Sequence, residues 1–368
     1  MAMPMKPGSS DPIAPSSSSS ERPLRILTLG MGALGSIYSF ILSRSTSPEC
    51  HVTCVCRSNY ATARDPSVGI TIRSEKFGVR EKWTPDVVFQ DGNEEHHAQS
   101  QQGEGYDYVL CCFKAVQESR PFMSEIVRPW LGATGKGPRI ILIQNGIGIE
   151  AEMQRNLVDV GLARGISSGI AWIGANLCEN GTVVTHGSMD RIELGLYESG
   201  HLAGSSAAAD QEIFQRAFNS GGGQLELKPD IQPIRWSKLL WNAAWASICS
   251  LSRQSLSTLL EPEVLPYVIG PVRRTMLEVI DVARADGIGE DRLPVEAVDK
   301  AFNITYVSRP RQEGDEHREG ELVSTLSDGF KPSLLLDLEA GRPMELKGII
   351  GNVVELARKH GVETPRLG

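Results

Sequence analysis

Short apolar runs alternate with segments of helical periodicity through the first half of the chain. The run LRILTLG, which begins at Leu24, is apolar and ends in glycine, as a buried parallel strand does. In the next segment apolar residues recur at the spacing of one helical face, and HVTCVC then returns to a strand pattern. This alternation predicts a parallel sheet covered by helices on both faces. Further strands are predicted at 69–73, 106–112 and 139–144, with a helix inside 114–130.

The pattern changes in the second half of the chain. ISSGIAWIGANL, GTVVTH and RIELGLYE are predicted as strands that extend or edge the same sheet, whereas helical patterns dominate from Gln232 onward. The Gln-rich segment 91–105 is expected to be a surface loop, and the Ser- and Pro-rich residues 1–22 a disordered tail. We therefore predict an α/β domain over residues 23–228 and an all-α domain over 229–368, with a ligand cleft between them.

Charge and composition restrict the class of protein. The 368 residues carry 37 Lys and Arg against 45 Asp and Glu, a formal net charge of −8, which argues against nucleic acid or an anionic membrane as the main partner. No stretch approaches the roughly 18–20 apolar residues that a membrane-spanning helix needs, so a soluble, cytoplasmic protein is expected. The seven cysteines form no CxxC pair, which predicts buried reduced thiols. The seven histidines and the cysteines also lack the spacing of metal ligands, so no metal site is expected.

A glycine motif follows the first predicted strand. Gly30, Gly32 and Gly35 form G-x-G-x-x-G at the start of the predicted helix. Such glycines allow a tight turn, close approach of a pyrophosphate and helix–strand packing, and the helix N-terminus adds amide donors. The strand before the motif and the helix after it favour a doubly wound, Rossmann-type dinucleotide site over an ordinary strand–helix turn. Its expected cofactor-binding residues are Gly30, Met31, Gly32, Ala33, Leu34 and Gly35.

The residue after the second predicted strand bears on the choice of cofactor. A site for NAD places Asp or Glu there, roughly 20 residues after the motif, to bind the ribose 2′-hydroxyl. Here Arg57 follows the strand, with Ser58 and Asn59 next, so no acid is expected near the ribose. A guanidinium can instead bind a 2′-phosphate through paired hydrogen bonds, which predicts NADPH/NADP+ as the cofactor. The alternative is an exposed arginine at a strand end.

Five segments occur in a characteristic order along the chain. FKAVQ follows the strand predicted at 106–112, QNGIG follows the strand at 139–143, and RWSKLLWN lies on a predicted helix. A Ser333…Glu345 pair and the ending ELARKHGVETP come later. Together these segments resemble the family of ketopantoate reductase, the NADPH-dependent enzyme that reduces 2-dehydropantoate to pantoate in pantothenate synthesis. The resemblance runs from Leu24 to Pro365.

The resemblance implies a role for each matching residue. Within the family the lysine of FKAVQ approaches the nucleotide, and the asparagine of QNG lies near both nicotinamide and substrate. The implied site residues are Lys114 and Asn145 on the cofactor side, Lys238 as the catalytic lysine, Asn242 as a substrate contact, Ser333 as the ligand of the substrate carboxylate, and Glu345 as the acid that hydrogen-bonds the substrate hydroxyl.

These residue types suit carbonyl reduction without reference to a family. Lys238 and Asn242 are four residues apart, so both project from one helical face. Hydride delivery to a carbonyl carbon builds negative charge on the oxygen, which a nearby ammonium stabilises and protonates, and Glu345 can orient that lysine or a substrate hydroxyl. Three tryptophans flank Lys238, and a lysine on such a packed helix needs a partner or a lowered pKa.

Ordinary structural roles stay open for the same residues. Without its context, Lys238 is a solvated lysine on an amphipathic helix. Asn145, before a glycine, has the composition of a turn. Ser333 and Glu345 each suit the first turn of a helix, where the helix dipole favours an acid such as Glu345.

One position departs from the family pattern. Ala246 stands where the family has a second asparagine, one helical turn after the first, and alanine cannot hydrogen-bond a substrate. Either Ser247 or a water compensates, or the substrate is not ketopantoate. We expect NADPH-dependent reduction of a small 2-oxo acid to a 2-hydroxy acid, foremost 2-dehydropantoate to (R)-pantoate, with a homodimer left open. The alternatives are a paralogous reductase of another 2-oxo acid or specialised carbonyl metabolite, and a non-catalytic NADPH-binding sensor.

Overall fold

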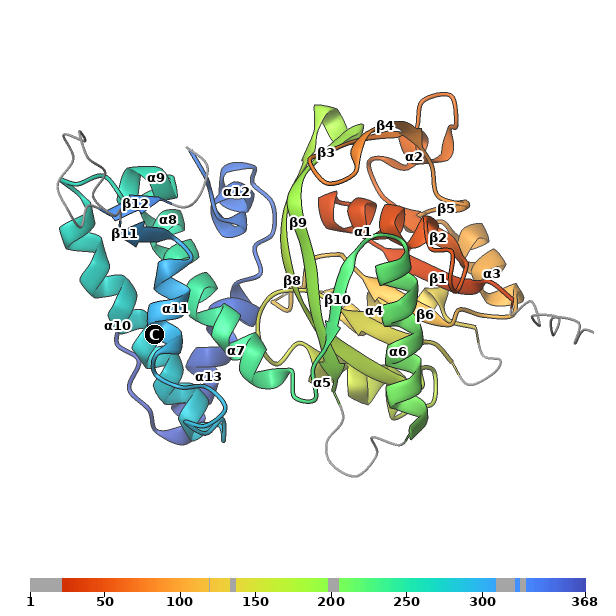
Figure 1. Cartoon of the computed structure of the whole chain (residues 1–368). Helices are drawn as coiled ribbons and strands as arrows, with labels where there is room; N and C mark the ends of the chain where they lie inside the picture. The colour runs from red at the N-terminus through yellow and green to blue at the C-terminus, as the bar shows by residue number, and fades with distance from the viewer. Residues whose placement is uncertain (1–21, 119, 133–136, 198–204, 309–321, 325–328) are drawn as a thin grey trace, which may run out of the picture.

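Strands gather in one half of the molecule and helices from the C-terminal third of the chain in the other (Figure 1). This computed structural model describes residues 22–118, 120–132, 137–197, 205–308, 322–324 and 329–368. The expected disordered tail lies outside the described residues except for Arg22. The expectation is wrong for that residue, because its guanidinium pairs with Asp107 at 2.8 Å.

A mostly parallel sheet forms the N-terminal part. Its strands are β1 (Leu24–Leu29), β2 (Cys50–Cys56), β3 (Ile70–Ser74), β4 (Gly78–Trp83), β5 (Val87–Gln90), β6 (Tyr108–Cys111), β7 (Arg139–Leu142), β8 (Gly165–Cys178), β9 (Val183–Leu196) and β10 (Gln224–Leu227). The order in the described part is β4-β3-β9-β8-β7-β6-β1-β2-β5, and β10 pairs with β9. From β5 through β2, β1, β6 and β7 to β8 the pairs are parallel, which is the strand order of a Rossmann-type domain. The pairs β3–β4 and β8–β9 are antiparallel.

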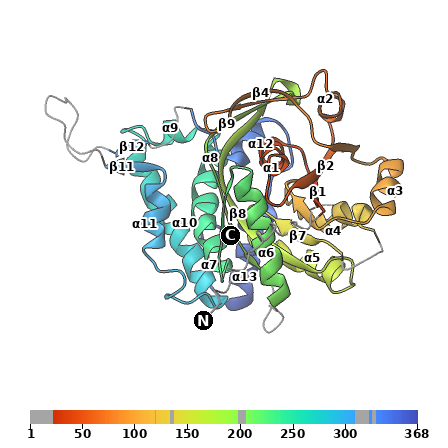
Figure 2. The same ribbon diagram turned by 45° about the vertical axis from the view of Figure 1, so that its right-hand side comes forward.

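Helices cover both faces of this sheet. Their bounds are α1 (Ala33–Ser43), α2 (Tyr60–Arg64), α3 (Glu94–Gln102), α4 (Met123–Val127), η1 (Arg128–Trp130), α5 (Glu150–Met153), η2 (Gln154–Val158), η3 (Glu179–Gly181) and α6 (Ser205–Ser220). Ile26 packs into a core with residues of α1 and α6, which lie side by side (Figure 2), whereas Leu27 packs into a second core with residues of α4 and α5. Successive residues of a strand point to opposite faces, so the unbroken apolar run of β1 buries both. The predicted Rossmann-type α/β fold is confirmed.

The C-terminal part is helical. Its elements are α7 (Gln232–Trp241), the π-helical turn η4 (Asn242–Ala246), α8 (Ser247–Ser252), α9 (Leu256–Leu259), α10 (Leu265–Ala285), α11 (Ala297–Asn303), α12 (Ser333–Glu339), the π-helical turn η5 (Lys347–Gly351) and α13 (Asn352–His360). A short antiparallel pair, β11 (Tyr306–Ser308) and β12 (Leu322–Ser324), accompanies them. Trp236, Trp245 and Val279 belong to a third core, separate from those of the sheet. The predicted helical domain is confirmed, and the boundary at residue 229 stays a prediction.

Two segments differ from the sequence expectation. The strands expected from GTVVTH and RIELGLYE are parts of one long strand, β9. The segment 91–105, expected as a loop, contains α3, because Asn93 caps its start by accepting the N–H of His96 at 3.1 Å. The ring of His97 then packs edge-on against Trp130 at 4.3 Å between ring centroids. Capping and ring packing hold a helix that has no apolar face of its own.

All seven cysteines are free thiols, as their spacing predicts. Four of them, Cys54, Cys56, Cys111 and Cys249, are buried. None of the helices within the described ranges is long and apolar enough to cross a membrane.

Candidate active site

Two loops meet at the carboxyl edge of the sheet where the strand order reverses. β1 lies between β2 and β6, and open α/β sheets bind ligands at such a point. Leu29, the last residue of β1, pairs with Cys111, the last residue of β6. The loop from Gly30 into α1 and the loop from Cys112 to Lys114 therefore start side by side.

The glycine turn is shaped by close backbone contacts. Gly30 has a φ of +94°, and a Cβ there would lie 2.6 Å from the backbone nitrogen of Phe113. A Cβ on Gly35 would lie 2.1 Å from the carbonyl oxygen of Gly30. Both positions thus require glycine, one where the two loops touch and one where helix meets turn.

Gly32 differs from the other two glycines, because a Cβ there would meet nothing within 4 Å. It is the N-cap of α1, whose first turn carries no acidic residue and no side-chain cap. The first N–H groups of a helix have no intrahelical partner and attract anions. Met31 is buried beneath this turn, and Ala33 and Leu34 begin the helix. The turn therefore fits the pyrophosphate of a dinucleotide.

Arg57 lies beside an acid at the end of β2. Its Nε is 2.6 Å from Oδ2 of Asp91, and the arginine side chain is 69% exposed. Both residues line a small crevice together with Gly30 and Phe113. The sequence around Arg57 offers no acid, but the fold supplies one, because β5 pairs in parallel with β2 and brings Asp91 to the same edge.

Lys114, the predicted cofactor-side lysine, contacts the helical part of the molecule. Its ammonium forms an ion pair with Asp337 of α12. Asp337 is almost fully buried and also accepts a hydrogen bond from Nε of Arg342 at 3.0 Å. The loop after β6 is thus fastened to α12 through a carboxylate that two cations share.

Glu345 joins the loops that follow β6 and β7. Its Oε1 accepts the N–H of Ala115 at 3.0 Å, and its Oε2 accepts Nδ2 of Asn145 at 3.3 Å. Burial raises the pKa of its carboxyl, against the opposing effect of these two donors and of Lys114. The structure therefore brings Lys114, Asn145 and Glu345 together, although they come from three distant segments.

Lys238 approaches the same region from α7. This helix buries Trp236, Leu239 and Leu240, which leaves Lys238 half-buried where α7 faces β8. Its Nζ donates to the carbonyl oxygen of Ala171 at 2.6 Å and lies 5.4 Å from the centre of the Trp172 ring.

Burial and neighbouring charges shift the pKa of Lys238. Burial and the charge of Arg235 lower the pKa of Lys238 to about 8, and Glu345 acts in the opposite direction. The partner and the lowered pKa that a packed lysine needs are both present. Such a group is protonated at neutral pH and releases its proton readily, which suits a general acid.

Two predicted substrate contacts lie outside this network. Asn242 is half-buried and begins η4, and its backbone N–H still donates to the carbonyl of Lys238, so the four-residue spacing that places both side chains on one helical face is kept. Its side chain makes no hydrogen bond within the described residues. Ser333 is exposed at the first position of α12, one turn before Asp337.

The departure at Ala246 also has a structural setting. Ala246 is buried in the core of the helical part. The hydroxyl of Ser247 is buried and has no hydrogen-bond partner among the described residues.

Three polar residues of the region were not anticipated from the sequence. Asp91 and Asp337 carry no local signal, because only the fold brings them to Arg57 and Lys114. Arg235 does carry one, since it stands between Ile234 and Trp236 in an otherwise packed segment. A charged residue there predicts a buried partner, which is Glu150 at 3.1 Å.

Comparisons with known proteins agree with this architecture. Sequence models described as "Ketopantoate reductase PanE/ApbA" and "Ketopantoate reductase PanE/ApbA C terminal" match residues 26–199 and 230–368. An uncharacterized protein of Saccharomyces cerevisiae is 30% identical over 354 residues, which are 93% of this chain and 90% of the yeast protein.

Solved structures give the same result. The crystal structure of 2-dehydropantoate 2-reductase from Methylococcus capsulatus has a TM-score of 0.67 and 29% identity, covering 94% of this chain and 93% of that one. The corresponding enzyme from Geobacter metallireducens has a TM-score of 0.68 and 25% identity, covering 94% and 96%. A Rossmann-like domain joined to a helical domain, with this site at the sheet edge, defines a class of oxidoreductases. Within that class, the chain belongs to the ketopantoate reductase family.

Proposed function

We propose that this protein is an NADPH-dependent reductase that converts a 2-oxo acid to a 2-hydroxy acid. The foremost substrate is 2-dehydropantoate, reduced to (R)-pantoate in pantothenate biosynthesis. The observation that carries the proposal is the contact of Glu345, from the helical part, with Ala115 and Asn145 in the two loops beside the glycine turn. Membership of the family and the likeness to the Methylococcus and Geobacter 2-dehydropantoate 2-reductases support the same reaction.

The chain has a residue for each part of the cofactor. The turn from Gly30 to Gly35 holds the pyrophosphate, and Arg57 binds the 2′-phosphate in exchange for its contact with Asp91. Lys114 and Asn145 serve the nicotinamide half. When bound, NADPH supplies the hydride that reduces the carbonyl carbon.

Lys238 supplies the proton. Its ammonium leaves the carbonyl of Ala171 for the substrate oxygen, stabilises the negative charge that develops there and then protonates it. Glu345 orients Asn145 and accepts a hydrogen bond from the substrate hydroxyl. The side chains of Asn242 and Ser333 have no partner in this network and bind the substrate. Ser333 hydrogen-bonds the carboxylate of the substrate.

The test is NADPH oxidation, followed by nicotinamide absorbance, with 2-dehydropantoate beside a panel of other 2-oxo acids. Efficient turnover of 2-dehydropantoate supports the proposal in full. Tight NADPH binding without turnover of any member of the panel contradicts it and favours a non-catalytic sensor.

One observation favours a second candidate, a reductase of a different 2-oxo acid or specialised carbonyl metabolite. Ala246 offers no hydrogen bond and lies in an apolar core. Losing one buried polar contact costs about 1–3 kcal/mol when the substrate is unchanged. Turnover of another panel member with higher kcat/KM than 2-dehydropantoate would select this candidate.

A further inference from the structure

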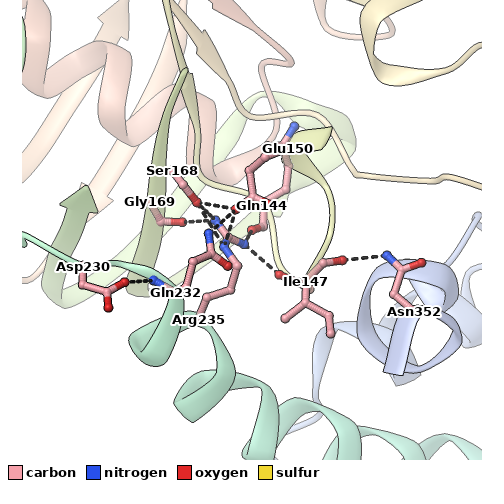
Figure 3. Close-up of polar contacts among 10 residues, drawn as sticks. Gln144, Ile147, Glu150, Ser168, Gly169, Asp230, Gln232, Arg235 and Asn352 are labelled. Carbon is pink, nitrogen blue, oxygen red and sulfur yellow. Dashed lines mark hydrogen bonds and ion pairs between the residues drawn. The ribbon is translucent and has the colours of Figure 1, made fainter. Parts of the chain in front are cut away.

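A buried arginine stands one helical turn before Lys238 on α7. The side chain of Arg235 is 0% exposed, and its fork of donors points into the junction between α7 and the sheet (Figure 3). Nε and Nη2 contact Oγ of Ser168 at 3.1 and 2.7 Å, and Nη2 also donates to the carbonyl of Gly169 at 3.0 Å. Both acceptors belong to β8, at the level where it pairs with the end of β7.

The remaining nitrogen of Arg235 contacts the loop that carries Asn145. Nη1 donates to the carbonyl of Gln144 at 2.9 Å and to that of Gly146 at 2.8 Å, the residues on either side of Asn145. On its other side this loop is tight, because a Cβ on Gly146 would lie 2.5 Å from the backbone of Gly348. One guanidinium nitrogen thus holds the carbonyl groups of both residues that flank Asn145.

Glu150 balances the charge of Arg235. Its Oε1 lies 3.1 Å from Nε of Arg235 and accepts hydrogen bonds from Ser168 at 2.7 Å and Gln232 at 3.2 Å. Both partners of the pair are almost fully buried. Burying two charges is costly even when they are paired, and apolar side chains of similar volume usually serve stability as well. Stability alone therefore does not account for this pair.

We propose that Arg235 is a positioning residue, which sets Lys238 and Asn145 relative to each other by clamping α7 onto β8 and onto the carbonyl groups of the two residues that flank Asn145. The proposal rests on the proposed function in one respect, namely that Lys238 is the acid. Arg235 does not touch the reacting atoms. It acts through the helix that bears Lys238 and through the loop that bears Asn145.

The charge of Arg235 also acts on Lys238. The charged groups around this lysine are Arg235 on its own helix and Glu345 from the segment before η5. The ring of Trp172 on β8 also faces Lys238. Two charged residues of β9 contact that ring: the guanidinium carbon of Arg191 lies 5.6 Å from its centre, and Glu193 accepts a hydrogen bond from its Nε1 at 2.7 Å. Removing the charge of Arg235 leaves Glu345 and an unpaired Glu150, so the pKa of Lys238 rises.

Two substitutions separate geometry from charge. Arg235→Lys keeps the charge and loses the fork, and Arg235→Met loses both. Arg139→Lys is the matched control, because Arg139 is a buried arginine paired with Asp210 at the opposite end of β7. Steady-state kinetics with NADPH and the best 2-oxo acid give kcat and KM. Acetylation of Lys238 as a function of pH, measured by mass spectrometry on cofactor-free protein, gives its titration midpoint without any need for turnover.

The expected results differ among the three variants. Arg235→Lys keeps the midpoint of Lys238 and lowers kcat about tenfold with a smaller change in KM, because an ammonium cannot reproduce the fork. Arg235→Met raises the midpoint by about one pH unit and lowers kcat roughly a hundredfold. Arg139→Lys lowers the melting temperature and leaves kcat and the midpoint as in the wild type.

Two results overturn the proposal. One is a kcat within twofold of the wild type in Arg235→Lys, which also decides the matter when Arg235→Met does not fold. The other is an unchanged Lys238 midpoint in folded Arg235→Met. When no 2-oxo acid is reduced by the wild type, the proposed function fails, and the acetylation profiles still decide whether Arg235 controls Lys238.

Discussion

The site has two parts that differ in how they are formed, here called the backbone wall and the charged wall. The glycine turn after β1 is formed by backbone, and its requirements are steric, since a Cβ on Gly35 would lie 2.1 Å from a carbonyl oxygen. The second, the charged wall, includes Lys238 and Glu345 and is formed by buried or half-buried charged side chains held by contacts between distant segments. The first wall is sensitive to added atoms, and the second to lost charges and donors. Substitutions on the two walls should therefore fail in different ways.

The largest effect is expected on the charged wall. Lys238→Ala removes the proposed acid and should lower kcat by about 10²–10⁴-fold, while NADPH affinity changes little. Steady-state kinetics and fluorescence titration of NADPH measure the two quantities. Near-normal turnover in this variant would exclude Lys238 as the acid.

An intermediate effect is expected for Arg57, a side chain that lies beside the glycine turn. Arg57→Ala should weaken NADPH binding about 10–100-fold and NADH binding far less, because a charge-assisted contact to the 2′-phosphate is worth about 1.5–3 kcal/mol. Asp91→Asn is the companion variant. It frees Arg57 from its partner and should strengthen NADPH binding. An equal loss of both cofactors in Arg57→Ala would contradict the assignment.

The glycine turn allows a matched pair of substitutions. Gly35→Ala places a methyl group against the carbonyl of Gly30, so it should lower the free energy of unfolding by more than about 1 kcal/mol and weaken NADPH binding. Gly32→Ala has open space and a backbone that alanine adopts, so the free protein should keep its stability and lose only NADPH affinity. Chemical denaturation and NADPH titration separate the two. Undiminished NADPH affinity in Gly32→Ala would show that the pyrophosphate does not bind at this turn.

The smallest effect concerns stability against pH. The pKa of Lys238 is lowered from 10.5 to about 8 in the folded protein, so between these values the unfolded chain binds the proton that the folded protein has released. The free energy of unfolding of the wild type should therefore rise with pH across this window, relative to Lys238→Met. Denaturation curves of both proteins at several pH values measure the difference. A parallel pH dependence of the two would show that this lysine is not perturbed.

The difference between the walls also explains what the sequence could predict. The glycine turn and its strand and helix lie within some twenty consecutive residues, so residue types and spacing were sufficient. The contacts of Glu345 with Ala115 and Asn145 span 230 and 200 residues. Glu345 and Asn145 were predicted only through the likeness to a family, and the backbone contact of Ala115 was not predicted.

Features without a local pattern were missed for the same physical reason. Asp91 reaches Arg57 only because β5 pairs with β2. The polar helix α3 is stabilised by its cap and by ring contacts. Tertiary contacts determine whether such features form, whereas β1, β2 and β6 can be recognised from their apolar runs in the sequence.

The central claim is that a hydride passes from NADPH to the carbonyl carbon of a 2-oxo acid at this site. Deuterium transfer tests it most directly. The protein is incubated with NADPH carrying deuterium at the reactive carbon of the nicotinamide, with each face labelled in turn, and with 2-dehydropantoate and the other 2-oxo acids. The account predicts a 2-hydroxy acid with deuterium on the carbon that bears the new hydroxyl, from one labelled face only. Binding of the labelled NADPH without transfer to any of the acids would contradict it.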